Sequence, residues 1–311
     1  MRSGVEEEMV LMYIRGIRIR LPRLGTRKLY MLLKPIIEKN GIKMGRDKLF
    51  AVLRDNGLLV KPRRKRKKTT DSNHGLRKYS NIIKEYEPSG PEQIWASDIT
   101  FISTEEGFVY ASLITDQYSK KIVGYHVHPT LEAKGPLKAL RMAMNKRCHH
   151  DTPLIHHSDR GIQYCCEEYI QLLRRSKMSI SMSSPGNPYE NAVAERVNGI
   201  LKNEFYLDGY FLNINQVRQV LKESVSIYNN ERPHASCDYL TPQQAHLRHG
   251  VLKKRWRKYK TKSRPRKIDD QTRSALELLI SRKTEFSTFQ HVSTKKKKQK
   301  EITTTNTVNI F

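Results

Sequence analysis

Residues 93–102 read QIWASDITFI, residues 107–115 read GFVYASLIT, and residues 121–128 read KIVGYHVH. All three segments are rich in β-branched and aromatic residues, which favour strands. Gly107 and the stretch 116–120 separate them as turns. The pattern predicts a meander of three antiparallel strands, and the rest of the domain is expected to build on it.

Helical and strand-like segments alternate after the meander. In chain order, the pattern predicts a helix over 132–147, a strand over 153–158, a helix over 165–176, a strand over 178–183, and helices near 190–205 and 215–229. The resulting order, β-β-β-α-β-α-β-α, is typical of a mixed five-stranded sheet with helices on its faces. The fold class expected for this part of the chain is therefore α/β.

A smaller helical region is predicted before the sheet. Residues 26–40, TRKLYMLLKPIIEKN, carry an apolar stripe at helical spacing, and Gly41 follows as a stop. Pro35 lies inside the stripe and is expected to kink or shorten this helix. A second short helix fits residues 46–56. Two short helices followed by a basic run suggest a helix-turn-helix that binds DNA, although an ordinary helical hairpin has the same pattern.

Positive charge dominates the composition. Of the 311 residues, 58 are Lys or Arg and 31 are Asp or Glu, which gives a formal net charge of +27. Seven of the eight residues 61–68 are basic, and residues 251–300 hold 18 basic against 4 acidic residues. Such an excess favours a polyanionic partner, because each neutralised phosphate releases counterions. Nucleic acid is the partner that we favour, although a membrane or ribosomal surface would attract the same charges.

Three acidic residues fall at special places in the predicted sheet. Asp98 lies inside the first strand, Asp159 at the end of the fourth, and Glu195 on the helix after the fifth. Open α/β sheets place their sites at strand ends and neighbouring helices. Clustered carboxylates repel one another unless cations lie between them, and such oxygen ligands suit Mg²⁺ or Mn²⁺. Taken singly, each of these acids is more simply a solvated surface carboxylate.

The pattern around Glu195 separates this residue from the core side of its helix. The apolar residues Val193, Val197, Ile200 and Leu201 cluster on one side. Glu195 and Lys202 project together from the opposite side, where Lys202 would meet a DNA phosphate. Gly199 lies on that exposed side as well, and it would allow a DNA backbone to approach closely.

The sequence motifs around the three acids are more specific than the spacing of the acids. They are WASDIT at 95–100, HSDRGIQY at 157–164, SMSSPGNPYENAVAERVNGILKNE at 181–204, and YNNERPH at 228–234 followed by Thr241-Pro242. With 35 residues between Asp159 and Glu195, this pattern resembles the DDE catalytic core of retroviral integrases and insertion-sequence transposases. It is most similar to the second-frame product (OrfB) of elements with two overlapping reading frames. The resemblance spans roughly residues 22–247.

This resemblance implies a ribonuclease-H-like fold and an activity. DNA strands would be cut by water, and the freed 3′-hydroxyl would then attack a second phosphodiester, with two divalent ions, Mg²⁺ or Mn²⁺, as cofactors. Asp98, Asp159 and Glu195 are the expected catalytic residues and metal ligands. The expected DNA contacts are Lys202, Arg46, Lys48, Arg63, Arg64, Lys65 and Arg66. Supporting roles are expected for Gly161, Gln163, Tyr164, Asn187, Asn191 and His157.

The expected organisation follows from these assignments. It comprises a helix-turn-helix-like DNA-binding domain at 1–60, a basic run and linker at 61–90, an integrase-like catalytic core at 91–250, and a basic, largely disordered tail at 251–311. The four cysteines lack the paired spacing of a zinc site. With no signal peptide and no apolar run near the roughly 18 residues of a membrane span, a cytoplasmic, nucleoid-associated bacterial protein is expected.

The implied partners are the DNA ends of the element, target DNA, further copies of the chain on DNA, and an upstream-frame product (OrfA) or a fusion with it. Two alternatives remain open at this point. One is a ribonuclease-H-like nuclease that only hydrolyses, and the other is a non-catalytic DNA-binding regulator of a full-length transposase.

The sequence departs from the family pattern at one place. Cys237 and Asp238 stand where the family usually has leucine and glycine, which would alter a local turn.

Overall fold

The computed structural model describes residues 2–61, 74–184 and 190–255. Several positions singled out above lie outside these ranges: Arg63, Arg64, Lys65, Arg66, Asn187 and most of the basic segment 251–311. None of the helices that the described residues form combines the length and apolar character needed to cross a bilayer.

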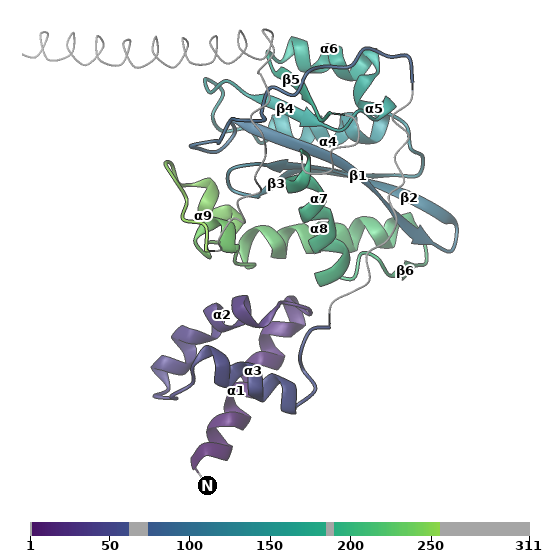
Figure 1. Ribbon diagram of the computed structural model, residues 1–311. Helices are drawn as coiled ribbons and strands as arrows, with labels where there is room; N and C mark the ends of the chain where they lie inside the picture. The colour runs from purple at the N-terminus through teal and green to yellow at the C-terminus, as the bar shows by residue number, and fades with distance from the viewer. Residues whose placement is uncertain (1, 62–73, 185–189, 256–311) are drawn as a thin grey trace, which may run out of the picture. The chain divides into compact units, whose positions relative to one another are not determined.

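A mixed sheet is the centre of the larger folded part (Figure 1). Its strand order is β3-β2-β1-β4-β5, with β1 at Ile94–Thr104, β2 at Gly107–Asp116, β3 at Ile122–His128, β4 at Ile155–Ser158 and β5 at Ser179–Met182. The pairs β1–β2 and β2–β3 are antiparallel, whereas β1–β4 and β4–β5 are parallel. The predicted meander and the five-stranded mixed sheet are therefore confirmed. A two-residue strand β6 (Tyr210–Phe211), which was not predicted, pairs with the end of β1.

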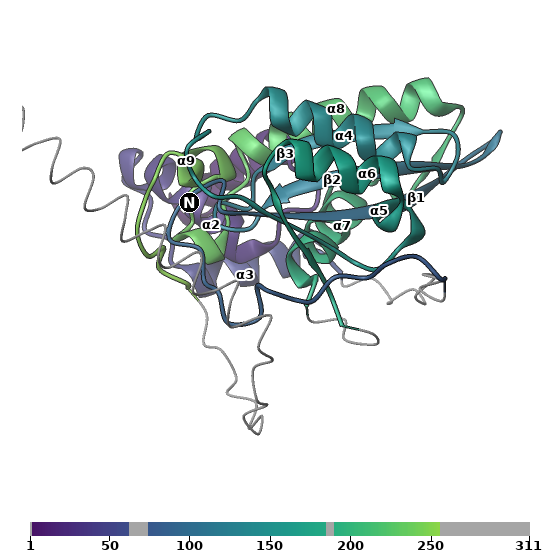
Figure 2. The ribbon, with the colours of Figure 1, turned by 90° about the horizontal axis from the view of Figure 1, so that it is seen from above.

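Helices cover both faces of the sheet, as Figures 1 and 2 show. One face carries α4 (Lys134–Asn145), α5 (Ile162–Cys165) and α6 (Glu167–Arg175), and the other carries α7 (Ala192–Glu204) and α8 (Ile214–Asn230). Each face encloses its own buried apolar cluster. Trp95 and Leu140 belong to the first cluster, and Leu113 and Val197 to the second. Successive residues of β1 point to opposite faces, so Asp98 shares a face with α7 and Ser97 points toward α5 and α6.

Close packing of α4 on β3 depends on Gly124. A Cβ atom at this position would lie 2.2 Å from the backbone oxygen of Ala139. Any larger residue would push the helix away from the strand, because a backbone oxygen cannot move aside as a flexible side chain can. A glycine is thus required for this layer to close.

The segment before β1, expected to be a linker, packs against the sheet where it is described. Residues 75–93 form no helix or strand, yet Ile82 and Ile83 are buried. The backbone N–H of Ile82 donates to Ser181 Oγ at 3.1 Å, and Met182 N–H donates to the Ser80 carbonyl at 3.3 Å. This segment therefore covers the outer edge of β5.

The N-terminal residues form three helices, α1 (Arg2–Arg20), α2 (Thr26–Lys39) and α3 (Arg46–Asp55). The helices predicted over 26–40 and 46–56 are confirmed. The expectation that Pro35 shortens the first of them is wrong, because α2 continues to Lys39 with Leu33 and Ile37 buried on either side of the proline. Gly41 ends this helix with a φ of +66°, the left-handed conformation that glycine adopts without cost.

Two further helices, α1 and α9, were not predicted from the sequence. The long helix α1 carries no clear apolar stripe, although Val10 and Ile14 are buried. The short helix α9 (Pro242–His246) begins with a capping box in which Thr241 and Gln244 bond each other's backbone N–H groups. Just before it, Asp238 adopts a φ of +55°, so aspartate takes a left-handed position where the family usually has glycine.

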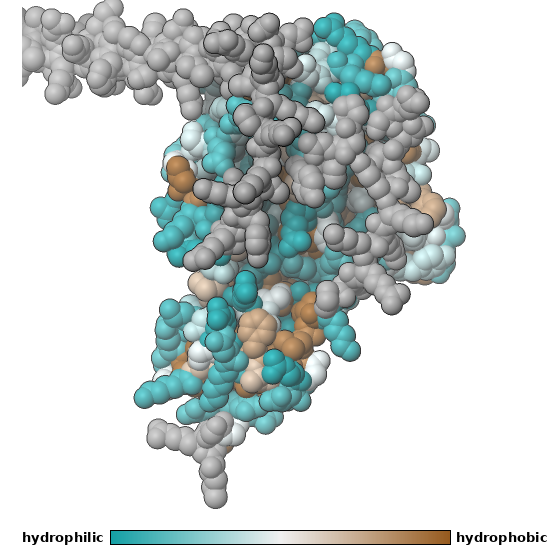
Figure 3. Space-filling view, in the orientation of Figure 1, coloured by the Kyte–Doolittle hydropathy of each residue, from teal (hydrophilic) through white to brown (hydrophobic). Residues whose placement is uncertain are grey.

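The surface view agrees with this arrangement of apolar residues. Where grey atoms do not cover it, the face of the core in Figure 3 is mostly hydrophilic. The apolar side chains of the strands lie inside, between the sheet and its two helical layers.

Candidate active site

The carboxylates of Asp98 and Asp159 come from adjacent parallel strands. In the register of β1 with β4, Ala96 pairs with His157. Asp98, within β1, and Asp159, directly after β4, each follow that pair by two residues, so the two acids lie at the same level. Neighbouring strands lie about 4.8 Å apart, which brings the two carboxylates into one another's electrostatic field.

Asp98 is ionised with difficulty at this position. Its Oδ2 accepts a hydrogen bond from Asn198 Nδ2 at 2.7 Å, and its Oδ1 accepts one from the Ile99 N–H at 2.9 Å. Both bonds favour the charged form. Burial nevertheless raises the pKa of Asp98 to about 7, with further contributions from the negative charges of Asp159 and then Glu195. The protein's own groups thus leave the negative charge at this point uncompensated.

A tight turn holds Asp159 directly after β4. The Asp159 Oδ1 atom accepts a hydrogen bond from the Gly161 N–H at 2.9 Å. A Cβ atom at position 161 would lie only 3.0 Å from Asp159 Oδ1 and 3.0 Å from Gln163 Oε1. Gly161 therefore allows the carboxylate to fold back on the following backbone. Gln163 donates to the Leu131 carbonyl at 2.8 Å and so fixes the loop before α4.

Glu195 lies in the first turn of α7 and is exposed. Two asparagines attach this helix to β1. Asn191 Nδ2 donates to the Ser97 carbonyl at 3.0 Å, and Asn198, three residues after Glu195, reaches Asp98. Residues three apart on a helix share a face, so the side of α7 that carries Glu195 is turned toward the Asp98 strand.

The three acids do not form a closed ligand set. Within residues 2–61, 74–184 and 190–255, no three His, Cys, Asp or Glu side chains lie close enough together to hold a metal ion. The influence of Asp159 and Glu195 on the pKa of Asp98 shows that all three share one electrostatic neighbourhood.

Lys202, two turns after Glu195 on α7, is placed against an aromatic ring. Its Nζ atom lies 4.3 Å from the centroid of the Phe101 ring, a cation–π contact. Phe101 lies three residues beyond Asp98 on β1 and packs edge-to-face on Phe108 at 5.4 Å. The ammonium group is thereby held along the same strand and helix that carry Asp98 and Glu195.

Tyr164 and His157 lie beneath this site rather than in it. Tyr164 is buried, and its hydroxyl accepts a hydrogen bond from Ser97 Oγ at 3.0 Å. His157 is fully buried, and its Nδ1 pairs with Ser181 Oγ at 2.9 Å. Burial lowers the pKa of His157 to about 4, so the imidazole is neutral at physiological pH. These contacts brace β1, β4 and β5 under the carboxylates.

The predicted DNA contacts on the first helices are exposed. Arg46 and Lys48 lie in the first turn of α3, and Arg46 Nε also bonds Asp47 Oδ1 at 2.9 Å.

Two residues of the site were not predicted, Asn198 and Phe101. Asn198 carried a usable signal, because it lies three residues after Glu195 on the same predicted helix. Phe101 carried none, since only the fold brings it to Lys202.

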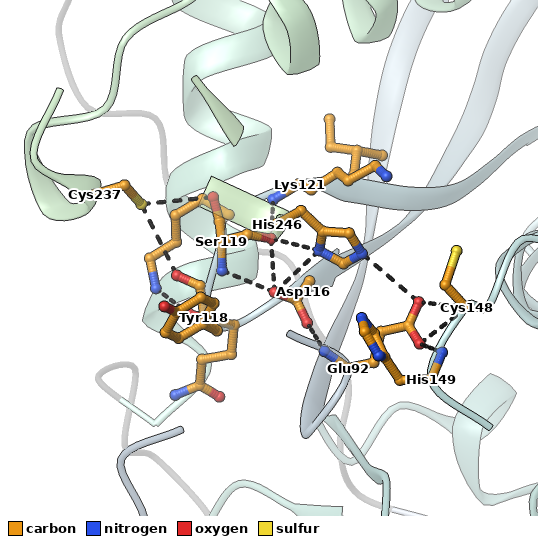
Figure 4. A network of polar contacts seen from close by, with 12 residues as sticks. Glu92, Asp116, Tyr118, Ser119, Lys121, Cys148, His149, Cys237 and His246 are labelled. Atoms are coloured by element: carbon orange, nitrogen blue, oxygen red, sulfur yellow. Dashed lines mark hydrogen bonds and ion pairs between the residues drawn. The ribbon is translucent and has the colours of Figure 1, made fainter. Parts of the chain in front are cut away.

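A second pair of carboxylates is found elsewhere in the core (Figure 4). Glu92 accepts hydrogen bonds from the backbone N–H groups of Cys148, at 3.1 Å, and His149, at 2.6 Å. Asp116 accepts from the Glu92 N–H at 2.7 Å and from Ser119 Oγ at 2.7 Å. The imidazole of His246 lies between the two acids, 3.6 Å from Glu92 Oε1 and 3.7 Å from Asp116 Oδ1. The cluster joins α9 to the ends of β1 and β2.

The electrostatics of this second cluster are the reverse of those at Asp98. Burial opposes the ionisation of Glu92, but hydrogen bonds from His246, His149 and Cys148 outweigh it and bring the pKa of Glu92 to about 2. For His246, burial is outweighed by hydrogen bonds to Asp116 and Glu92, so its pKa is raised. The two carboxylates are balanced by His246 and by Arg147, whose Nε lies 3.9 Å from Glu92 Oε2, and the cluster is a structural clamp.

Comparison with known proteins identifies the family. The integrase core domain model matches residues 88–188, and a second integrase core domain model matches residues 176–242. The "Insertion element IS600 uncharacterized 31 kDa protein" of Shigella sonnei is 35% identical over 230 residues, covering 73% of this chain and 84% of that protein. The "Transposase InsF for insertion sequence IS3A" of Escherichia coli K12 is 34% identical over 196 residues, covering 62% of this chain and 68% of that protein.

Among solved structures, the HTLV-2 integrase catalytic core in complex with magnesium is 18% identical, with a TM-score of 0.42, and covers 51% of this chain and 99% of that chain. The family matches and the sheet order agree with the ribonuclease-H-like fold expected from the sequence. The chain belongs to the insertion-sequence transposases of the DDE/integrase superfamily.

Proposed function

We propose that this transposase cuts and rejoins DNA strands with Asp98, Asp159 and Glu195 as its catalytic residues. The observation that carries the proposal is the pairing of Asp98 and Asp159 at one level of two parallel strands, where the pKa of Asp98 is raised to about 7. Perturbed carboxylates that share a site are a common mark of catalytic centres. The exposed position of Glu195 on α7 leaves access for a large substrate.

The three carboxylates fit divalent cations, Mg²⁺ or Mn²⁺, and we propose two ions. Oxygen donors of this type suit these ions, and the uncompensated negative charge at Asp98 is what a cation would neutralise. When bound, two such ions supply the Lewis-acid chemistry of phosphoryl transfer. The HTLV-2 integrase core, a member of the same superfamily, was solved in complex with magnesium, an ion of the class proposed for this chain.

The chain's own residues would orient the reacting groups. Asn198 and the Ile99 N–H fix both oxygens of Asp98, and the Gly161 N–H fixes one oxygen of Asp159. Below pH 7 Asp98 retains a proton, which it must release before it can act as a ligand. Lys202, held over Phe101, would contact a phosphate near the scissile bond.

DNA binding is proposed to extend beyond the core. The exposed Arg46 and Lys48 on α3 and the basic run with Arg63, Arg64, Lys65 and Arg66 would hold the element ends, with residues 1–60 as the DNA-binding domain, 61–90 as the connection and 91–250 as the catalytic core. The basic segment 251–311 would add nonspecific contacts. Working on two ends requires further copies of the chain on DNA, and we propose an upstream-frame product as a partner, in the bacterial cytoplasm at the nucleoid.

A donor-plasmid assay in cells tests the activity. The plasmid carries the DNA that flanks the gene, with any upstream overlapping frame fused to it, and joined element ends are detected by junction amplification. We expect joined ends with the wild type and none with Glu195→Gln. The matched control is Glu223→Gln, an exposed glutamate on α8, which should retain the wild-type yield.

The same assay separates the alternatives. Cleaved but never joined ends would identify a hydrolytic nuclease. Binding of the ends without cleavage, in wild type and variant alike, would identify a non-catalytic regulator. Equal joining by wild type and Glu195→Gln would overturn the assignment of Glu195.

A further inference from the structure

A basic cavity opens on the edge of the sheet away from the catalytic carboxylates. It has a volume of about 340 Å³ and lies between the start of β3, the end of α4, α8 and His246 of α9. Three lysines line it, each from a different part of the fold: Lys121 before β3, Lys146 after α4, and Lys222 on α8. The other polar groups of its wall include Asn229, Ser226 and Tyr125.

The cavity has an excess of positive charge. No Asp or Glu is among its lining residues, and none of the three lysines forms an ion pair within the described part of the chain. Lys121 is half-buried, and burial lowers its pKa; nearby Cys148, Glu92 and Asp116 oppose this shift, and Lys146 adds a repulsive charge. Holding these ammonium groups together is unfavourable without an anion between them.

The nearest carboxylates, Glu92 and Asp116, act on Lys121 at longer range, but among the described residues their ion-pair partners are Arg147 and His246 and not the three lysines. In Figure 4 the imidazole of His246 contacts both Glu92 and Asp116; Glu92 also accepts from backbone N–H groups, and Asp116 from a backbone N–H and Ser119. Asn229 is also engaged, because its side chain bonds both the N–H and the carbonyl of Ile122 at the edge of β3. Among the described residues of the wall, the three lysines and His246 are the groups that can carry charge, and His246 is already bonded to Glu92 and Asp116. The lysines therefore remain to bind a charged ligand.

We propose that this cavity binds a phosphate group, supplied by a DNA backbone away from the scissile bond. Lysine recognises phosphate as a point charge, and three lysines that line one cavity can meet the several oxygens of one phosphate. Ile122, Val123 and Val225 form the apolar part of the wall. The choice of DNA as the source rests on the proposed function, while the phosphate site itself does not.

The topology separates this site from the catalytic one. The strand β2 lies between β3 and β1, so β3 is about 10 Å from β1. Ile122, the first residue of β3, is level with Thr115 of β2 and Ala96 of β1, and Asp98 lies two residues, about 7 Å, further along β1. The start of β3, which lines the cavity, thus lies roughly 12 Å from Asp98, and a bound duplex would be held at a second point.

Lysine acetylation, read by mass spectrometry on the full chain, tests the proposal. The probes are a duplex of arbitrary sequence in one arm and inorganic phosphate in the other. We expect the duplex to protect Lys121, Lys146 and Lys222, with Lys138 as the internal control, because it is exposed on α4 but does not line the cavity. Protection by phosphate but not by the duplex would support the anion site and assign it to a free anion.

Charge variants give a second, quantitative readout. In Lys146→Gln/Lys222→Gln both changes are at exposed positions, so folding should be intact. We expect the slope of log binding constant against log salt to fall by about 0.9 for each phosphate that the variant no longer neutralises. The control Lys138→Gln/Lys177→Gln removes the same charge from exposed positions outside the cavity and should leave the slope within error.

Two results would overturn the proposal: no protection by either probe, or equal changes of slope in both double variants. Neither depends on catalysis. If Asp159→Asn retained cleavage, the proposed function would fail while protection of the three lysines by phosphate still held. If cleavage behaved as expected and the lysines stayed reactive, only the cavity site would fail.

Discussion

The core contains two pairs of close carboxylates, and the protein treats them in opposite ways. Glu92 and Asp116 are bound by backbone N–H groups and by the imidazole of His246, and the pKa of Glu92 falls to about 2. Asp98, beside Asp159, accepts hydrogen bonds from Asn198 and one backbone N–H among the described residues, and its pKa rises to about 7. The first pair is neutralised from within, whereas we propose that the second is neutralised by a cation from outside.

Removing a carboxylate from the second pair should have the largest effect. Asp159→Asn keeps the shape of the side chain but removes a ligand charge, so we expect strand cleavage to fall by about 10³-fold or more, since metal stabilisation of the transition state amounts to several kcal/mol. DNA binding should persist. Cleavage of labelled element ends and a filter-binding assay measure the two properties. Asp151→Asn, an exposed acid, is the control, and equal loss in both variants would contradict the account.

Breaking the first pair should damage stability instead of chemistry. His246→Ala removes the imidazole between two buried carboxylates, and such a loss typically costs about 3 kcal/mol or more. Urea denaturation should show a lower unfolding midpoint, while the metal dependence of the remaining activity stays as in the wild type. The exposed His150→Ala should change neither. A His246→Ala protein with wild-type stability would show that the clamp does not stabilise the fold.

Asn198 offers a smaller test of the second pair. Asn198→Ala removes the 2.7 Å hydrogen bond to Asp98 Oδ2, and the loss of a partner that orients a ligand commonly lowers metal affinity by about 10- to 100-fold. It should also raise the pKa of Asp98 further, because this bond favours the charged carboxylate. Asn203→Ala, exposed on the same helix, is the matched control. Unchanged metal affinity would exclude an orienting role for Asn198.

The pH dependence of stability distinguishes the two pairs with the smallest expected effect. A carboxyl whose pKa is raised to about 7 in the folded state costs stability in the ion-free protein as pH rises from about 4 to 7, because only the unfolded chain ionises freely there. Asp98→Asn should remove this cost and be more stable than wild type at pH 8, by on the order of 1 kcal/mol after screening.

The clamp titrates in the opposite sense. Glu92, with its lowered pKa, contributes stability above about pH 4.5 that is lost as pH falls toward 2. His246, with its raised pKa, contributes most below pH 6.5 and loses its contribution as pH rises through its folded pKa. Unfolding curves over this pH range measure all three groups, and a wild type and Asp98→Asn with parallel profiles would contradict the account.

Sequence patterns predicted the strands and the three acids, but not how the acids meet. Richness in β-branched and aromatic residues located β1, β2 and β3 and placed Asp98 on the first of them, and Asp159 was placed at the end of the fourth predicted strand. That both acids follow the same register pair is a property of strand pairing, which no local pattern contains. The elements β6 and α1 were missed because one is two residues long and the other has no apolar stripe.

The clamp of Glu92, Asp116 and His246 could not be predicted from the sequence for a related reason. His246 and Glu92 are far apart in the chain, and neither lies in a motif that pairs them. Two buried acids and a buried imidazole would each have been interpreted alone as surface groups. Only tertiary packing brings α9 against the ends of β1 and β2, so this part of the molecule could not be predicted from local periodicity.

Calorimetric titration with Mg²⁺ tests the central claim most directly, namely that the Asp98 pair is left for an external cation. At pH 6.5, in buffers of different ionisation enthalpy, binding should release protons as the Asp98 carboxyl becomes a ligand, and Asp98→Asn should abolish both the binding and the release. Binding of Mg²⁺ to Asp98→Asn with wild-type affinity, or no binding to the wild type, would contradict the account.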